Sequence, residues 1–144
     1  MIFILQSQWN ESITQALATK AFDTIRSHST MACEIVKVPG ALELPLVAQW
    51  LAEKNQASVS GFVACGCVIK GETFHFEIVA NESARGLTEV SLKYSVPIAN
   101  AILAVFENKE AIARSSSNHN KGEEAALSLL KMIEIRRQIT GEKN

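Results

Sequence analysis

Short apolar runs alternate along this chain with stretches whose apolar residues recur at helical spacing. The apolar runs cover residues 2–5, 33–38, 59–69 and 96–105. Uninterrupted runs of this length are typical of strands buried on both faces of a parallel sheet. Helical stretches begin near residues 10, 44, 78, 109 and 121. The alternation predicts βαβ units with right-handed crossovers, and therefore a three-layer α/β sandwich around a parallel sheet of about four strands.

Each longer helical stretch has one apolar face, which we expect to pack against the sheet. Asn10 stands where a helix N-cap is expected, with Glu11 in the first turn. The expected inward positions are Ile13, Leu17, Ala21, Thr24 and Ile25, then Leu44, Val47, Trp50 and Leu51, then Ser83, Leu87, Val90, Ser91 and Tyr94, and finally Ala125, Leu129, Met132 and Ile133.

The expected binding site lies along one edge of this sheet. In parallel α/β sheets, ligands bind beyond the carboxyl ends of the strands. The segments that fall there are residues 7–10, residues 39–43, residues 70–75 and the residues after the fourth strand.

The composition fits one folded domain over residues 1–144. Hydrophobic residues make up 47% of the chain and charged residues 20%, which excludes long disorder. The formal net charge of −1 gives no reason to expect a nucleic-acid partner. No apolar stretch approaches the roughly 18–20 residues of a membrane span, and the apolar start lacks the features of a signal peptide. We therefore expect a soluble, cytoplasmic protein.

The three cysteines, Cys33, Cys65 and Cys67, are odd in number and lie in apolar runs. We interpret them as reduced thiols, with Cys65 and Cys67 as small core residues. The pair lacks the Cys-x-x-Cys spacing of zinc and redox sites, and no pair of His, Cys, Asp and Glu has metal-ligand spacing. We expect no metal.

Two residues of the predicted edge are candidates for chemistry. His75 follows the third apolar run, where a general acid or base would lie, although a solvated loop histidine fits the same pattern. Trp9 directly follows the first strand and is either a ring packed at the rim of the sheet or a stacking platform for a flat ligand. His28 and His119 are interpreted as surface residues.

The segment Lys70-Gly71-Glu72-Thr73 could hold a phosphate with backbone amides and a hydroxyl at a helix N-terminus. It is not a Walker motif, and the chain contains no Gly-x-Gly-x-x-Gly. Arg114 and Lys121 flank a Ser/Asn-rich loop and could supply cations to the same anion. A solvated, charged loop is the alternative interpretation.

Taken in order, these segments resemble the lumazine synthase family, and the resemblance covers nearly the whole chain. The third of its four segments is the most specific. The segments are Gln8-Trp9-Asn10-Glu11-Ser12-Ile13-Thr14; Val38-Pro39-Gly40-Ala41-Leu42-Glu43-Leu44-Pro45; Gly66-Cys67-Val68-Ile69-Lys70-Gly71-Glu72-Thr73-Phe74-His75-Phe76-Glu77, leading into Val79-Ala80-Asn81-Glu82; and Val96-Pro97 with Asn120-Lys121-Gly122-Glu123-Glu124-Ala125-Ala126.

The resemblance implies a transferase of riboflavin biosynthesis on a flavodoxin-like sheet. This family condenses 5-amino-6-(D-ribitylamino)uracil with 3,4-dihydroxy-2-butanone 4-phosphate. The products are 6,7-dimethyl-8-ribityllumazine, phosphate and water, and the reaction uses no metal or organic cofactor. The expected partners are therefore the two small substrates and further copies of the chain. The resemblance also raises riboflavin synthase as a further partner.

The roles of the site residues also follow from the resemblance. His75 matches the family's proton-transfer residue, and a carboxylate such as Glu43 suits a polyol because it accepts hydrogen bonds from adjacent hydroxyls. Trp9 matches the aromatic that stacks on the pyrimidine. The ribityl chain is matched to Ala41, Leu42 and Glu43, the pyrimidine edge to Cys67, Val68 and Ile69, and the phosphate to Glu72, Thr73 and Arg114, with Lys121 as a further cation.

Three departures from the family pattern stand out. Asn100 occupies a position where many members have an aromatic residue, so a hydrogen bond is expected to replace stacking from a second subunit. The loop at residues 115–119 is about one residue shorter than the common form. The usual first strand ahead of Ile2 is almost absent. Family members form pentamers with sites shared between subunits, and some pack twelve pentamers into a shell; we expect a pentamer here and favour its free form.

Two other function classes fit this sequence less well. A ligand-binding relative on the same fold would keep Trp9 and Glu43 but would need neither His75 nor Arg114. A flavodoxin or response-regulator module would need a phosphate-binding first loop or acidic residues after the first and third strands. The segments Ser7-Gln8-Trp9 and Lys70-Gly71 supply neither.

Overall fold

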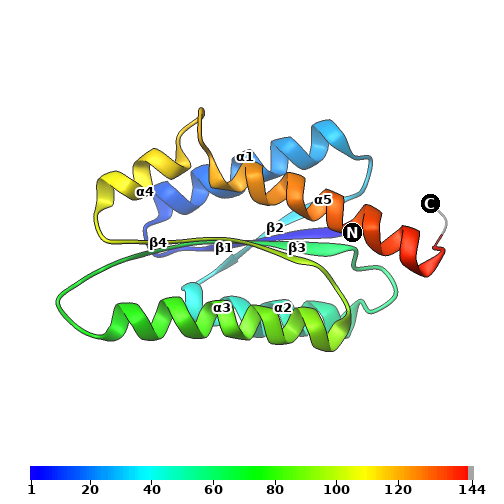
Figure 1. Cartoon of the computed structure of the whole chain (residues 1–144), viewed down its shortest axis with the longest axis horizontal. Coiled ribbons are helices and arrows are strands. Elements are labelled where there is room, and N and C mark those ends of the chain that lie inside the picture. The colour runs from blue at the N-terminus through cyan, green and yellow to red at the C-terminus, as the bar shows by residue number, and fades with distance from the viewer. Residues whose placement is uncertain (143–144) are drawn as a thin grey trace.

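The computed structural model describes residues 1–142 and is a three-layer α/β sandwich (Figure 1). The elements, in chain order, are β1 (Ile2–Ser7), α1 (Glu11–His28), β2 (Cys33–Val38), the short 3₁₀ helix η1 (Ala41–Glu43), α2 (Leu44–Lys54), β3 (Gly61–Ile69), α3 (His75–Tyr94), β4 (Ile98–Val105), α4 (Asn108–Ser115) and α5 (Lys121–Thr140).

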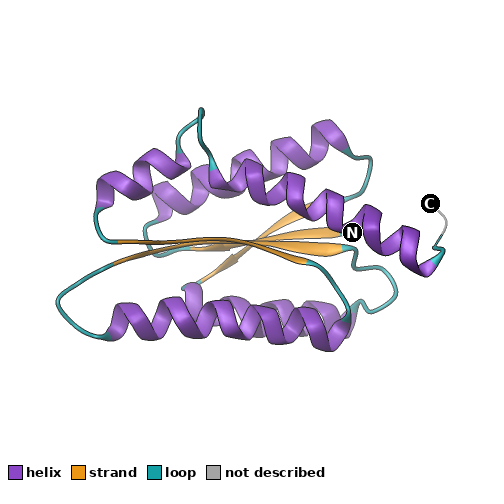
Figure 2. Ribbon diagram, in the orientation of Figure 1, coloured by secondary structure: helices purple, strands orange, loops and turns teal. Residues whose placement is uncertain are grey.

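The sheet has the strand order β2-β1-β3-β4, and every pair of neighbouring strands is parallel. Helices α2 and α3 cover one face, and α1, α4 and α5 cover the other (Figure 2). Strand order reverses between β1 and β3, since the chain builds outward to β2 on one side and to β4 on the other. The fold class expected from the sequence is thus confirmed.

The core forms two apolar layers, one on each face of the sheet. Ile2 and Ile4 of β1 point toward α1 and α5, while Phe3 and Leu5 point toward α2 and α3, as the alternation of a strand requires. The rings of Phe3 and Phe62 stack with centroids 5.9 Å apart. Burial of the whole of β1 explains why its sequence shows no polar alternation.

Two of the expected inward residues are wrong. Trp50 is 58% exposed and Met132 is 50% exposed, although both fit the helical spacing. The sheet-facing positions of α2 are Leu44, Ala48 and Ala52, which are buried, with Val47 and Leu51 packed beside them. Trp50 lies on the other side of the helix and points outward. On α3 the buried positions are Val79, Ser83, Leu87 and Val90, while Ser91 and Tyr94 are only partly buried.

Strand and helix ends differ from the expected bounds by at most three residues. β3 begins at Gly61 and β4 at Ile98, each two residues later than the apolar runs predict. α3 begins at His75, three residues earlier than expected. The earlier start matters for function because it makes His75 the first residue of a helix instead of a loop residue.

Candidate active site

A pocket of about 300 Å³ opens at the carboxyl edge of the sheet, where the strand order reverses between β1 and β3. This switch point is the place where open α/β sheets bind ligands. The pocket draws on the ends of three strands and on the start of α3. Its lining residues are Trp9, Asn10, Ala41, Cys67, Val68, Ile69, His75 and Val79.

Trp9 forms one wall of this pocket and is 74% exposed. Its indole lies against Gly40, where a Cβ atom would come within 3.2 Å of Trp9 Cδ1 and within 2.9 Å of Glu43 Oε2. The absence of a side chain at Gly40 therefore lets the indole and the Glu43 carboxylate approach the same backbone position. This places an aromatic face next to a hydrogen-bond acceptor.

The opposite wall is the end of β3. Cys67 is buried, whereas Val68 and Ile69 are half-buried, and all three residues line the pocket. Burial raises the pKa of the Cys67 thiol to about 11, which keeps it protonated near neutral pH. Cys65 is fully buried, and the prediction that both residues are core thiols is confirmed.

The loop between β3 and α3 carries Glu72 and Thr73, both exposed. The Thr73 hydroxyl accepts a hydrogen bond from the His75 backbone N–H at 3.4 Å, which bends the loop into the first turn of α3. His75 lines the pocket with an exposed imidazole. Leu42, Glu43, Glu72 and Thr73 flank the pocket without lining it.

Three predicted site residues lie away from this pocket within one chain. Asn100 pairs in register with Ala64, three positions before the pairing of Leu103 with Cys67, and its Oδ1 accepts the Ile102 N–H at 2.8 Å. Arg114 lies in the last turn of α4 and donates to the Glu110 carbonyl at 3.2 Å. Lys121 begins α5 and pairs with Glu124 at 2.6 Å.

The loop between α4 and α5 is held at both ends by the buried Asn120. Its Nδ2 donates to the carbonyls of Ser115, at 2.8 Å, and Ala16, at 3.2 Å, while its Oδ1 accepts the Gly122 N–H at 2.8 Å. Residues 116–119, which lie between Ser115 and Asn120, are exposed. His119 belongs to this stretch and His28 is also exposed, so the interpretation of both as surface residues is confirmed.

The sequence indicated Asn10 as a helix cap inside the expected edge segment 7–10 but gave it no role in the site, and it did not assign Val79 to the site. Both line the pocket. Asn10 does occupy the N-cap position, but its side chain makes no capping hydrogen bond and donates to the Cys67 carbonyl at 3.1 Å. An asparagine directly after a strand and an aromatic was the available signal, since Asn tolerates left-handed backbone.

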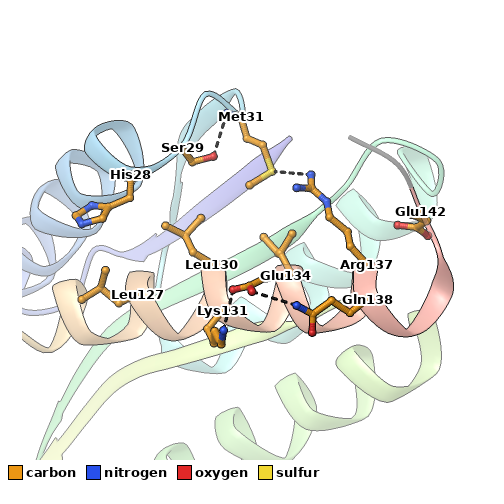
Figure 3. Close-up of a pocket in the computed structure, with 11 residues that line it drawn as sticks. His28, Ser29, Met31, Leu127, Leu130, Lys131, Glu134, Arg137, Gln138 and Glu142 are labelled. Carbon is orange, nitrogen blue, oxygen red and sulfur yellow. Dashed lines mark hydrogen bonds and ion pairs between the residues drawn. The ribbon is translucent and has the colours of Figure 1, made fainter.

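A larger groove of about 760 Å³ lies at the opposite edge of the sheet, between the end of α1 and α5 (Figure 3). Its Glu134 carboxylate accepts hydrogen bonds from Lys131 and Gln138, and Arg137 contacts the Met31 sulfur. Because the groove lies at the amino ends of the strands and its two acids, Glu134 and Glu142, are already paired with Lys131 and Arg136, we place the candidate site in the smaller pocket. Residues 1–142 contain no cluster of three or more His, Cys, Asp or Glu that could hold a metal ion.

No helix within residues 1–142 is long and apolar enough to cross a membrane.

An aromatic ring, a carboxylate and an imidazole gathered at the switch point of a flavodoxin-like sheet are the arrangement of an α/β enzyme that acts on a small molecule. Comparison with known sequences makes the class specific. Residues 1–137 match the family of 6,7-dimethyl-8-ribityllumazine synthase, and the chain belongs to that family.

Known proteins of that name are similar to this chain over most of its length and most of their own. The protein from Paracidovorax citrulli (strain AAC00-1) is 42% identical over 141 residues, which is 96% of this chain and 88% of the relative. The protein from Leptothrix cholodnii (strain ATCC 51168 / LMG 8142 / SP-6) is 43% identical over 136 residues, 93% of this chain and 85% of the relative. The protein from Cytophaga hutchinsonii is 40% identical over 133 residues, 90% and 82% respectively. The family and these names support the condensation reaction of riboflavin biosynthesis.

Proposed function

We propose that residues 1–144 act as one cytoplasmic domain that condenses 5-amino-6-(D-ribitylamino)uracil with 3,4-dihydroxy-2-butanone 4-phosphate at the pocket between β1 and β3. One observation carries the proposal: Trp9 faces a pocket whose other boundaries are the end of β3 and His75. A flat ring stacked on the indole would meet main-chain donors and acceptors at its edge and an imidazole at its reactive side.

The polar tail of the pyrimidine has a matching subsite beside Trp9. η1 places Ala41, Leu42 and Glu43 next to the indole, through the close approach at Gly40. The exposed Glu43 carboxylate can accept hydrogen bonds from two neighbouring hydroxyls of a ribityl chain. This arrangement favours a ring that carries a polyol over a bare heterocycle.

The phosphate of the second substrate is assigned to the start of α3. Glu72 and Thr73 precede the helix, whose first backbone amides and positive dipole end favour an anion. Arg114 and Lys121 would complete the charge from a neighbouring subunit, since neither lines the pocket of its own chain. Asn100 would reach the ring from the same neighbour.

Proton transfer is assigned to His75. The uracil amine attacks the butanone carbonyl, and water leaves as a Schiff base forms. Phosphate is then eliminated, the ribitylamino nitrogen closes the second ring, and another water departs. An imidazole can accept and donate protons near neutral pH, which suits a sequence that needs both. Holding two substrates together supplies the remaining acceleration, without metal or organic cofactor.

Absorbance scanning of the purified chain with both substrates tests the function, with formation of the lumazine chromophore as the expected result. Light scattering of the same sample tests the shared site. A mass of five chains supports a free pentamer, and a mass of sixty supports a shell. An active protein with the mass of one chain would overturn the assignment of Arg114, Lys121 and Asn100. Coelution with riboflavin synthase tests that further partner.

A further inference from the structure

The hydrogen-bond ladder between β1 and β3 stops before β3 ends. The last paired residues are Gln6 and Cys65, so continued pairing would place Gln8 opposite Cys67. The chain instead turns into α1 after Ser7. The turn would leave a strand-end carbonyl without its ladder partner, and a buried carbonyl without a donor is costly.

Asn10 takes the place of the missing strand residue with its side chain. Its Nδ2 donates to the Cys67 carbonyl at 3.1 Å. The bond joins the start of α1 to the end of β3 across the switch point, between two residues that line the pocket.

The backbone of Asn10 makes this reach possible. Its φ of 56° and ψ of 49° lie in the left-handed region, which Asn adopts more readily than most residues. Its carbonyl accepts the N–H groups of Ile13 and Thr14 at 3.0 and 3.1 Å, so the backbone starts α1 while the side chain points back to the sheet. Thr14 Oγ1 also donates to the Ser7 carbonyl at 2.5 Å. The segment that carries Trp9 is therefore fixed on both sides.

We propose that Asn10 is a positioning residue for the pyrimidine subsite. Through one carboxamide it sets the distance between Trp9, its neighbour in sequence, and the strand end at Cys67. The Asn10–Cys67 hydrogen bond thereby fixes the two walls of the pocket relative to each other. The inference rests on the site proposed above, and it concerns the geometry of that site before any ligand binds.

The test uses Trp50→Phe as background, because Trp50 lies on α2 outside the pocket and Trp9 then becomes the single tryptophan. Asn10→Gly keeps the left-handed backbone and removes the hydrogen bond to the Cys67 carbonyl. Asn10→Asp keeps the shape of the side chain but replaces its donor with an acceptor. Ser12→Ala, an exposed change in the same turn, is the matched control. The readouts are the near-ultraviolet circular dichroism of Trp9 without ligand, quenching of Trp9 fluorescence by 6,7-dimethyl-8-ribityllumazine, and the two KM values.

Both Asn10 variants should change the ligand-free spectrum of Trp9 and weaken lumazine binding roughly three- to tenfold, the loss expected for one hydrogen bond. The KM for the butanone phosphate should stay at the control value. An unchanged spectrum in Asn10→Gly overturns the inference even if binding weakens, because a direct ligand contact would leave the free site intact. If the lumazine binds the background protein without quenching Trp9, the proposed site is wrong, and the ligand-free spectrum still decides the role of Asn10.

Discussion

The ammonium of Lys70 lies 5.4 Å from the centroid of the Phe106 ring, and the Lys70 backbone N–H donates to Val105 at 2.9 Å. Phe106 also packs against Phe76, with ring centroids 6.2 Å apart. These contacts hold the first residue of the β3–α3 loop against the end of β4. The loop that carries Glu72 and Thr73 is therefore anchored at its start by an aromatic ring and at its end by the first turn of α3.

Removal of this anchor should weaken binding of the phosphate substrate. Phe106→Ala is expected to raise the KM for the butanone phosphate about two- to fivefold, as for an exposed cation–π contact of about 0.5–1 kcal/mol. Phe106→Trp should retain the wild-type KM. Leu92→Ala, an exposed change on α3, is the control for steady-state kinetics. An equal rise in both KM values would mean that Phe106 supports the whole edge of the sheet.

His75→Ala should lower turnover and leave pyrimidine binding nearly intact. The imidazole lies at the rim of the pocket, and a positioned acid–base group contributes about 10²–10⁴-fold. The uncatalysed condensation reduces the observed loss. Stopped-flow turnover and lumazine binding would be compared with His119→Ala, which changes an exposed histidine outside the pocket. A wild-type rate in His75→Ala would refute the proton-transfer role.

Arg114→Ala should act on the other substrate. Loss of a charge-assisted hydrogen bond, worth about 1.5–3 kcal/mol, predicts a rise of roughly 10- to 100-fold in the KM for the butanone phosphate. The KM for the pyrimidine should change far less. Arg26→Ala, an exposed arginine at the end of α1, controls for the lost charge. Equal effects on both substrates would show that Arg114 has a structural role.

The buried cysteines predict a loss of stability at alkaline pH. Burial raises the pKa of Cys65 to about 12 and that of Cys67 to about 11, from an ordinary value of 9.0. As the pH rises above 9, the unfolded chain releases these protons first, so the unfolding free energy should fall until the folded thiols also ionise. Urea unfolding at neutral pH and at pH about 10 measures the change. If the unfolding free energy of Cys65→Ala falls less with pH than that of the wild type, this thiol contributes to the loss. If the two proteins lose the same unfolding free energy between the two pH values, the role of Cys65 is contradicted.

Gly122 permits the close contact of α5 with α1. A Cβ atom there would lie 2.1 Å from the Leu17 carbonyl oxygen, which belongs to backbone and cannot rotate away. Gly122→Ala should therefore cost about 1–3 kcal/mol of unfolding free energy or more, although alanine otherwise favours a helix. Gly71→Ala is the matched control for urea unfolding, since nothing lies within 4 Å of its added Cβ. Equal stabilities would disprove the close contact.

The order of strands and helices was predictable because it depends on local hydrophobic patterns. The apolar run from Ile2 to Leu5 and the alternation of strand-like runs with helical spacing were enough to locate the edge of the sheet that holds Trp9 and His75. The orientation of Trp50 was not predictable in this way. Helical spacing shows which residues share a face, but it did not show that the buried face of α2 is centred on Leu44, Ala48 and Ala52, which leaves Trp50 outside it.

Long-range hydrogen bonds were equally invisible in the sequence. The bond from Asn10 to Cys67 joins residues 57 positions apart, and no periodicity encodes it. The resemblance to a family placed Arg114, Lys121 and Asn100 in the site, whereas the geometry of one chain leaves them outside the pocket. A role for these three residues at this pocket would therefore require a neighbouring copy of the chain.

The clamp formed by Asn120 makes the length of residues 116–119 independent of the rest of the fold. Both ends of this stretch are fixed by bonds to α1, α4 and α5, so an added residue would extend outward without moving Arg114 or Lys121. Loop length then becomes a trait that can drift between relatives at little energetic cost, since loop entropy grows only slowly with length. The same property makes the stretch a natural insertion point, where a grafted peptide would be displayed on every copy of the chain.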